Sequence, residues 1–274
     1  MQSANGRWWY RHNNGTYTKN GWEYINGKWY YFNTNGIMAT GWISLNGEWY
    51  YLTSNGDMVT GAQTINNKEY YFTSEGVMVR GWHKENDKWK YYSPKKMSIY
   101  GRIFVEGEKV TGWLPINDKW YYIAEDGYMV TGIYKVGNRK YLFMEDGSMK
   151  TGWFKVDDTW YYISSDGELR AQWVKSLSNW YYVDVDGKMV TGYQTINGAK
   201  YYFASSGLMQ KGWFKINGED YYAASSGTIQ AQWVKSLSNW YYVDVDGKMV
   251  TGDYIIDGNV NYFDNQGLWM NKIN

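Results

Sequence analysis

Tryptophan pairs seven residues apart are the side chains in this sequence that point most clearly to a chemistry. Trp22 and Trp29 form one such pair, and two tyrosines, Tyr30 and Tyr31, follow directly. Indole and phenol rings have electron-rich faces, and rings grouped around a hollow attract a quaternary ammonium ion by about 0.5–2 kcal/mol per contact. The methyl groups of such an ion also gain apolar contact. The rings therefore predict a cation-binding site that needs no acidic side chain.

Catalytic and metal-binding interpretations find little support. The two histidines, His12 and His83, lie in unrelated contexts, and the absence of cysteine excludes disulfides, thiolate catalysis and zinc sites built on cysteine. The segment Asp184-Val185-Asp186-Gly187 resembles the start of a calcium loop, but no glutamate follows at the spacing that such a loop requires, so a β-turn is favoured. We expect no catalytic residue, no metal and no cofactor.

Composition narrows the class of protein. The 28 basic and 27 acidic residues nearly cancel, which excludes a strongly basic nucleic-acid-binding surface. A mean hydropathy of −0.65, with no long apolar run, predicts no membrane span. The 18 Trp, 30 Tyr and 8 Phe argue against disorder, which is poor in aromatic residues. We expect a folded chain with too few aliphatic residues for an ordinary aliphatic core.

A repeat of 20 residues organises the whole chain. Repeats begin at residues 21, 41, 61, 81, 112, 132, 152, 172, 192, 212, 232 and 252, and the break in spacing places an irregular insertion at 101–111. We therefore expect N-terminal repeats over 1–100 and C-terminal repeats over 112–274, in one continuous solenoid. The first residues already fit the repeat pattern, so we expect the chain to be part of a longer protein.

Each repeat is predicted to form one β-hairpin. Asn26-Gly27, between two runs of aromatic and β-branched residues, is a strong signal for a two-residue turn. This turn would place Trp22 opposite Tyr31, with Trp22, Trp29 and Tyr31 on one face. Ile25, Tyr30 and Phe32 share the other face, which we expect to form the interior of the solenoid. The sequence predicts an all-β solenoid, a superhelix of stacked hairpins.

The recurrent pattern GWxxxNGxWYYxxxxGxMxTG resembles the choline-binding repeat family, over essentially the whole chain outside the insertion. The resemblance implies about three hairpins per superhelical turn. It also implies a non-catalytic, secreted, cell-surface module that binds phosphocholine of cell-wall teichoic and lipoteichoic acids through aromatic cages between consecutive hairpins. The module would anchor an attached murein hydrolase or surface-protein domain, and a choline-linked homodimer is expected.

The resemblance also implies site residues, namely two tryptophans from one hairpin, a closing aromatic from the next and often a methionine. The five predicted choline sites are Trp22, Trp29 and Tyr51; Trp42, Trp49 and Tyr71; Trp153, Trp160 and Tyr182; Trp173, Trp180 and Tyr202; and Trp233, Trp240 and Tyr262. The linker residues expected to line them are, in the same order, Met38, Met58, Leu169, Met189 and Met249.

Other repeats depart from the pattern. The repeats that start at 61, 132, 192 and 252 lack the tryptophan pair, with Ala62 and Glu69 in the first of them, and should lack a site. Further candidate choline-binding residues are Trp82, Trp89, Trp113, Trp120, Tyr122 and Trp213.

Two alternatives remain open at this point. A glucan- or glycan-binding repeat module would need polar groups beside a flat ring to bind sugar hydroxyls. A hydrolase with its active site inside this chain would need a carboxylate pair that breaks the repeat, and the sequence suggests none.

Overall fold

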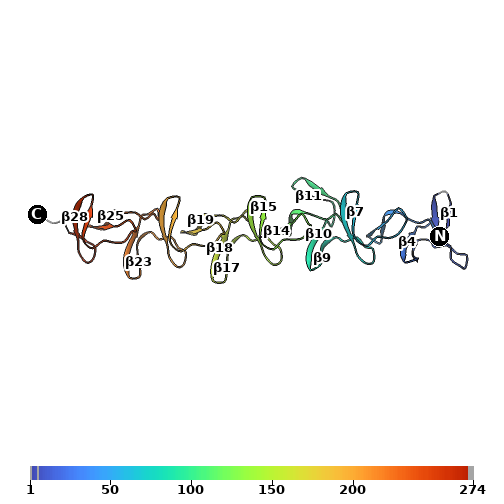
Figure 1. Cartoon of the computed structure of the whole chain (residues 1–274), viewed down its shortest axis with the longest axis horizontal. Coiled ribbons are helices and arrows are strands. Elements are labelled where there is room, and N and C mark those ends of the chain that lie inside the picture. The colour runs from blue at the N-terminus through green and yellow to red at the C-terminus, as the bar shows by residue number, and fades with distance from the viewer. Residues whose placement is uncertain (1, 5, 271–274) are drawn as a thin grey trace. The chain divides into compact units, whose positions relative to one another are not determined.

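The chain folds into β-hairpins that follow one another in sequence order (Figure 1). The computed structural model describes residues 2–4 and 6–270, and every regular element in this range is a β-strand. The strands pair with their sequence neighbours in antiparallel fashion. The prediction of an all-β chain of repeated hairpins is confirmed.

The chain divides into two compact units. The first comprises the residues up to Tyr134 together with Phe143–Met149, and the second comprises Lys135–Leu142 and the residues from Lys150 onward. The strands of the first unit are β1 (Gln2–Ala4), β2 (Arg7–Trp9), β3 (Gly21–Ile25), β4 (Lys28–Phe32), β5 (Gly41–Leu45), β6 (Glu48–Leu52), β7 (Gly61–Ile65), β8 (Lys68–Phe72), β9 (Gly81–Glu85), β10 (Lys88–Tyr92), β11 (Met97–Ile99), β12 (Arg102–Phe104), β13 (Gly112–Ile116) and β14 (Lys119–Ile123). The boundary passes through β15 (Gly132–Val136) and β16 (Arg139–Phe143). The second unit holds β17 (Gly152–Val156), β18 (Thr159–Ile163), β19 (Gln172–Ser176), β20 (Asn179–Val183), β21 (Gly192–Ile196), β22 (Ala199–Phe203), β23 (Gly212–Ile216), β24 (Glu219–Ala223), β25 (Gln232–Ser236), β26 (Asn239–Val243), β27 (Gly252–Ile256), β28 (Asn259–Phe263) and β29 (Trp269–Met270).

The turn at Asn26-Gly27 sets the register of its hairpin. Both residues have positive φ, 51° and 84°, as a two-residue turn of this kind requires. Trp22 lies opposite Tyr31 and Tyr24 lies opposite Trp29, as predicted. Since side chains alternate along a strand, this register fixes which rings share a face.

Backbone hydrogen bonds connect each hairpin to the linker of the next. The N–H of Met58, in the linker after β6, donates to the carbonyl oxygen of Trp29 on β4 at 2.8 Å. Met189 makes the same bond to Trp160 at 2.8 Å in the second unit. An isolated hairpin is marginally stable in water, so these bonds and the packing between neighbouring hairpins are what hold each unit together.

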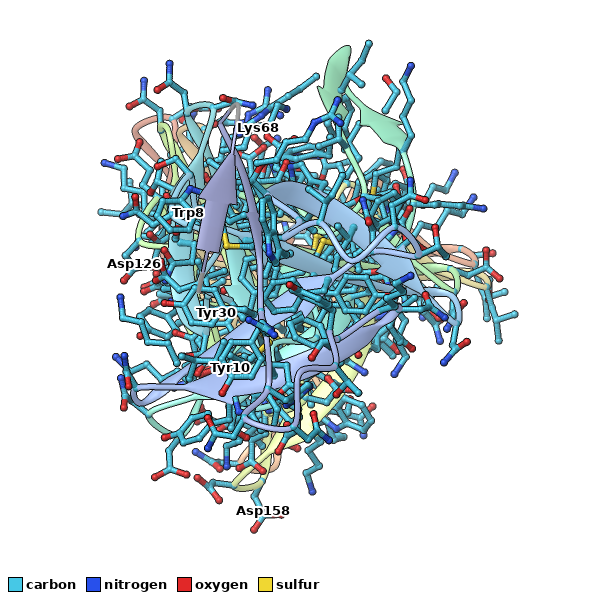
Figure 2. All side chains as sticks on the ribbon, turned by 90° about the vertical axis from the view of Figure 1, so that its right-hand side faces the viewer. Trp8, Tyr10, Tyr30, Lys68, Asp126 and Asp158 are labelled. Carbon is cyan, nitrogen blue, oxygen red and sulfur yellow. The ribbon has the colours of Figure 1, made fainter. Side chains whose placement is uncertain are left out.

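One position of the repeat, the last residue of the second strand of each hairpin, is buried throughout the core of each unit. Phe32, Leu52 and Phe72 are fully buried, and Ile163 and Phe203 occupy the same position in the second unit. The face predicted to be interior is therefore the buried one. Most hairpin tips carry polar side chains, although Leu177 and Leu237 are exposed at two of them. Figure 2 shows Asp158, which is 98% exposed, projecting outward.

The structure places the inserted residues earlier than the repeat spacing suggested. Ser93 donates its N–H to Glu108 O and accepts from Gly107 N–H, which is the pattern that Asn33 makes with Ile37 and Gly36 in an ordinary linker. The extra residues are therefore 94–104 and not 101–111. They are not irregular either, because β11 and β12 form a small hairpin with Tyr100 and Gly101 in its turn.

Candidate functional site

Four cavities in the described part of the chain share one design. Each is lined by two tryptophans of one hairpin, a tyrosine of the next hairpin and the methionine of the linker after that tyrosine; we term this group a cage and name it by its tryptophans. The four sets are Trp22, Trp29, Tyr50 and Met58; Trp42, Trp49, Tyr70 and Met78; Trp153, Trp160, Tyr181 and Met189; and Trp173, Trp180, Tyr201 and Met209. Their volumes range from about 310 to about 420 Å³, which is at the small end for ligand sites.

The walls of a cage are rings set at steep angles to one another. The ring centroids of Trp42 and Trp49 are 6.3 Å apart with an interplanar angle of 87°. Tyr70 lies 5.0 Å from Trp42 at 66°. In the second unit, Trp173 and Trp180 repeat this arrangement at 6.2 Å and 86°. Three walls that converge on one hollow suit a rounded cationic group better than a flat ligand.

In two of the cages the second tryptophan leaves the site open to solvent. Trp29 is 44% exposed and Trp160 is 43% exposed, whereas Trp49 and Trp180 are half-buried. A ring held by packing on one side and bare on the other offers its π-face to a ligand from solution. The cage is thus partly formed before any ligand arrives.

A methionine forms the floor of each cage, and its position is fixed by its neighbours. The N–H of Met58 is bound to Trp29, and its side chain lies against Gly76 of the following linker. Gly76 has a φ of 78°, and a Cβ at this residue would clash with the Met58 side chain. Glycine is therefore required here both for the backbone conformation and for the space that the methionine uses.

The structure corrects the closing ring of each predicted site. Tyr51 stays with its own hairpin, 5.1 Å from Trp42, while Tyr50 reaches Trp22 of the preceding hairpin at 5.2 Å. The reason is alternation along the strand: the face that packs against the preceding hairpin carries Tyr50, and the opposite face carries Tyr51. By the same one-residue shift, Tyr70 replaces Tyr71, Tyr181 replaces Tyr182 and Tyr201 replaces Tyr202.

The predicted linker residues are also displaced, by one repeat. Met38 donates its N–H to Trp8, not to Trp29, and Met58, not Met38, lines the Trp22–Trp29 cage. Met189 lines the Trp153–Trp160 cage, where Leu169 was predicted. The prediction was wrong because it took the linker that leaves the tryptophan hairpin, whereas the linker of the next hairpin folds back onto it.

The predicted site at Trp233 and Trp240 closes in a different way. The two indoles lie 6.4 Å apart at 87°, as in the cages. Asn261 occupies the position of the closing tyrosine, and its Oδ1 accepts a hydrogen bond from the indole N–H of Trp269 at 3.1 Å. Trp269 lies 5.4 Å from Trp233 at 75°, so it, and not Tyr262, provides the third ring.

Two further tryptophan pairs have the geometry of cage walls. Trp82 and Trp89 lie 6.5 Å apart at 82°, with Tyr121 at 5.2 Å from Trp82. Trp113 and Trp120 lie 6.2 Å apart at 84°. The ring of Tyr122 contacts Trp113 at 5.2 Å from within the same hairpin. The ring of Tyr100, from the inserted hairpin, stacks on Trp120 with 5.9 Å between centroids.

Trp213 belongs to a half-built cage. Its indole lies 5.4 Å from Tyr241, and Met249 donates its N–H to the carbonyl oxygen of Asp220 at 2.9 Å. Asp220 thus occupies the position of the second tryptophan, where it forms an ion pair of 2.7 Å with Lys215. One wall of the cage is a carboxylate in place of a ring.

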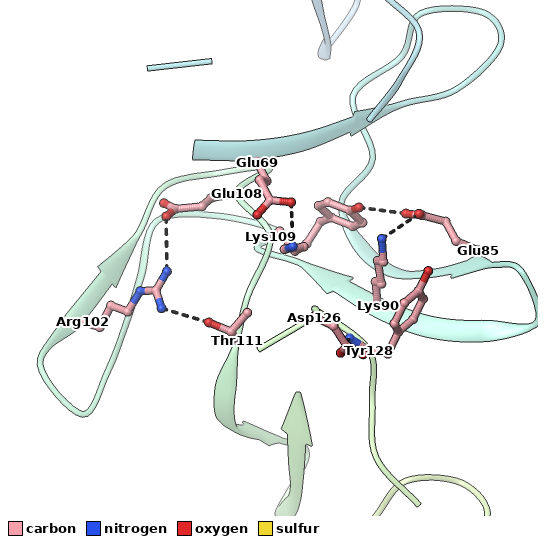
Figure 3. Close-up of polar contacts among 10 residues, drawn as sticks. Glu69, Glu85, Lys90, Arg102, Glu108, Lys109, Thr111, Asp126 and Tyr128 are labelled. Atoms are coloured by element: carbon pink, nitrogen blue, oxygen red, sulfur yellow. Dashed lines mark hydrogen bonds and ion pairs between the residues drawn. The ribbon is translucent and has the colours of Figure 1, made fainter. Parts of the chain in front are cut away.

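Ion pairs occupy three of the junctions that lack the tryptophan pair. Lys109 stands where other linkers have methionine, and its Nζ lies 2.6 Å from Oε2 of Glu69, which replaces the second tryptophan (Figure 3). In the second unit, Lys140 pairs with Asp186 at 3.1 Å and Lys200 pairs with Asp246 at 2.5 Å. A lysine ammonium of the chain itself therefore lies at these junctions, and no aromatic cage forms there.

Charged residues at the cage rims were missed by the sequence analysis. Glu75 lines the Trp22–Trp29 cage and Glu106 lines the Trp42–Trp49 cage. The hydrogen bond from the Ser74 hydroxyl lowers the pKa of Glu75, so this carboxylate is ionised at neutral pH. Both residues come from the linker two repeats beyond the tryptophan pair. The repeat spacing could have located these rim residues. Glu75 follows Trp29 by 46 residues, and Ser206, which lines the Trp153–Trp160 cage, follows Trp160 by the same 46 residues.

Within residues 2–4 and 6–270, no group of three or more His, Asp or Glu side chains is placed to hold a metal ion. In the same residues, no helix has the length and apolar character to cross a membrane.

Comparisons with known proteins agree with the repeat geometry. The choline-binding repeat model matches residues 19–60, 59–96, 110–142, 130–173, 190–232 and 230–272, and a cell wall binding repeat matches residues 172–189. No curated protein matches the sequence.

Among solved structures, CbpJ from Streptococcus pneumoniae TIGR4 is 29% identical with a TM-score of 0.68, covering 90% of this chain and 98% of that chain. Choline binding protein F from Streptococcus pneumoniae is 25% identical with a TM-score of 0.42, covering 98% of this chain and 100% of that chain. The modular autolysin LytC from Streptococcus pneumoniae is 22% identical with a TM-score of 0.37, covering 96% of this chain and 51% of that chain. The repeat model accounts for most of the sequence, and the chain belongs to the choline-binding repeat family.

Proposed function

We propose that this chain is a non-catalytic module that anchors a protein to the cell wall by binding phosphocholine of teichoic and lipoteichoic acids. The observation that carries the proposal is the cage itself, as at Trp42, Trp49 and Tyr70, where three rings converge on a hollow of about 310 Å³. A trimethylammonium group in that hollow would meet the π-faces of all three rings.

Affinity for the cell wall would come from the number of cages. Each ring contact contributes only about 0.5–2 kcal/mol, so a single cage should bind choline weakly. Four cages of common design on one chain, facing a polymer with repeated choline groups, convert later binding events into intramolecular ones at high effective concentration. Tight attachment then needs no tight single site.

The proposal assigns the described chain no catalytic residue. The module would bring an attached murein hydrolase or surface-protein domain to the cell wall, outside the cell. The support for this is the family assignment together with the repeats that fill residues 21–270. The choline-linked homodimer expected from the resemblance stays a prediction.

Retention on immobilised choline tests the proposal. The full chain should bind the matrix, elute with free choline and resist the same concentration of sodium chloride. Titration with dextran, followed by tryptophan fluorescence, should leave the signal unchanged. Elution by salt alone, or a response to dextran and not to choline, would contradict the proposal, and the second result would favour the glycan-binding alternative.

A further inference from the structure

The four cages have the same ring walls but different charges at the rim. Glu75 stands at the rim of the Trp22–Trp29 cage, and Glu106 at the rim of the Trp42–Trp49 cage. The polar residues that line the Trp153–Trp160 cage are both serines, Ser176 and Ser206, and carry no charge. The Trp173–Trp180 cage has Lys211 and Ser226. One chain thus contains carboxylate-rimmed, neutral and ammonium-rimmed versions of the same site.

Lys211 occupies a position of the repeat that normally carries threonine, two residues after the cage methionine. Arg80 is the residue at this position beside the Trp42–Trp49 cage, and its guanidinium is compensated by two carboxylates, Glu48 and Glu106. Lys211 differs because it is exposed and lines its cage, and no ion pair within residues 2–4 and 6–270 involves it. Its positive charge is therefore available to a ligand.

The chemistry of phosphocholine connects the two parts of this site. Two carbons and one oxygen separate the quaternary nitrogen from the phosphorus, so an ammonium held among the rings leaves its phosphate at the rim. A phosphate at this rim meets the Lys211 ammonium, with the Ser226 hydroxyl as a further donor on the same wall. At the Trp42–Trp49 rim, the phosphate would meet the Glu106 carboxylate. Glu106 and Glu48 share the single guanidinium of Arg80, so one negative charge is left uncompensated there and repels the phosphate.

We propose that Lys211 makes the Trp173–Trp180 cage selective for the whole phosphocholine zwitterion, whereas the carboxylate-rimmed cages favour a quaternary ammonium that carries no phosphate. This inference rests on the proposed function, because it takes the cages to be ammonium sites, and it adds a division of specificity among them. The Trp173–Trp180 cage is then the one best suited to polymer-linked phosphocholine, and it is the rim, not the rings, that distinguishes the sites.

Nitrogen-15 labelling of the indoles in the full chain resolves the cages individually. The indole N–H signals of Trp180 and Trp49, assigned with the variants Trp180→Phe and Trp49→Phe, are followed during separate titrations with choline, phosphocholine and inorganic phosphate. Trp180 should report phosphocholine binding about two- to fivefold tighter than choline, the range of an exposed ion pair, and Trp49 should report the reverse order. High salt should make the affinities for choline and phosphocholine nearly equal at both sites.

The matched variants are Lys211→Thr, which installs the common residue of the repeat, and Glu106→Gln. Lys211→Thr should abolish the preference at Trp180 and leave Trp49 unchanged, while Glu106→Gln should shift only Trp49 toward phosphocholine. Three results would overturn the inference while leaving the cages as choline sites. They are the same ligand preference at both indoles, a preference at Trp180 that survives Lys211→Thr, and a response of Trp180 to inorganic phosphate as large as its response to phosphocholine. Indoles that respond to neither choline nor phosphocholine would overturn the proposed function as well.

Discussion

The ring of Tyr201 crosses the indole of Trp173 at 71°, with 4.9 Å between ring centroids. The two residues belong to neighbouring hairpins, Trp173 to β19 and Tyr201 to β22. The adjacent Tyr202 contacts Tyr193 and Phe214 instead, at a junction without a tryptophan pair. A cage therefore exists only where two hairpins stack. Tyr201 forms a wall of the cage, whereas Tyr202, one residue further along the strand, takes no part in it.

This register determines which tyrosine contributes to choline binding. Tyr201→Leu should weaken choline binding at the Trp173–Trp180 cage by about two- to thirtyfold, because one cation–π wall is lost while an apolar contact remains. Tyr202→Leu is the matched control and should leave the affinity of that cage unchanged. Indole chemical shifts of Trp180 during a choline titration measure both. Equal losses in the two variants would refute the assignment of the closing ring.

The exposed wall of a cage should matter more for binding than for folding. Trp160 is 43% exposed and packs edge-to-face on Trp153, so Trp160→Ala should abolish binding at its cage while lowering the free energy of unfolding by about 1–2 kcal/mol. Ile163→Ala, at a fully buried position of the same hairpin, should cost about 2–5 kcal/mol. Chemical denaturation and calorimetric counting of bound choline separate the two effects. Loss of stability in Trp160→Ala as large as in Ile163→Ala would contradict this division.

A missing wall should be replaceable. Asp220→Trp places an indole beside Trp213, Tyr241 and Met249, and should raise the number of choline molecules bound per chain by one. The lost Lys215–Asp220 ion pair is exposed, so its removal should cost no more than about 1 kcal/mol. Isothermal titration calorimetry counts the sites. A folded variant with unchanged stoichiometry would show that the ring set is insufficient for binding.

The ion pair between Lys109 and Glu69 should respond asymmetrically to truncation. The Lys109 side chain is 9% exposed, whereas that of Glu69 is 57% exposed. Glu69→Ala leaves a buried ammonium without its partner and should cost about 1–3 kcal/mol. Lys109→Met restores the common residue of the repeat and leaves a carboxylate in contact with water, so it should be close to neutral. Urea unfolding of the two variants gives the comparison, and the opposite order would contradict it.

Acid should remove one local contribution to stability at Asp146. The hydrogen bond from the Ser148 hydroxyl, with the Ser148 N–H and the Lys119 ammonium, lowers the pKa of Asp146 to about 2 from its ordinary 3.8. Because the pKa is lower in the folded state, this carboxylate stabilises the fold above about pH 4, and the contribution is lost as the pH falls toward 2.

Asp146→Asn should therefore flatten the decline of the melting temperature between about pH 4 and pH 2. Asp118→Asn, at an exposed hairpin tip, is the control and should keep the wild-type profile. The effect should be small, since the ion pair with Lys119 is more than half exposed on both sides. Superimposable profiles for the wild type and Asp146→Asn would contradict the assignment.

The sequence specified most of the local structure because the signals were local. Asn26 and Gly27 determined the hairpin turn, and the turn determined that Trp22 faces Tyr31. The tryptophan walls of the cages followed from the repeat, since both lie on one hairpin. These features depend on residues fewer than ten positions apart.

What the sequence left undetermined lies between hairpins. Alternation alone does not say which face of a hairpin meets its predecessor, and for this reason Tyr51 was chosen where Tyr50 closes the cage. The rim residues Glu106 and Lys211 come from linkers further along the chain and become visible only when the hairpins stack. The insertion was misplaced because spacing locates a break in a repeat only to within one linker, whereas the hydrogen bonds of Ser93 locate its start.

A crystal structure of the chain with choline soaked in tests the central claim most directly. We predict density for a trimethylammonium group between the two indoles and the closing tyrosine at each of the four cages, with Trp42, Trp49 and Tyr70 as the reference site, and none at the Glu69–Lys109 junction. Cages that stay empty at saturating choline, or choline bound away from the tryptophan pairs, would contradict it.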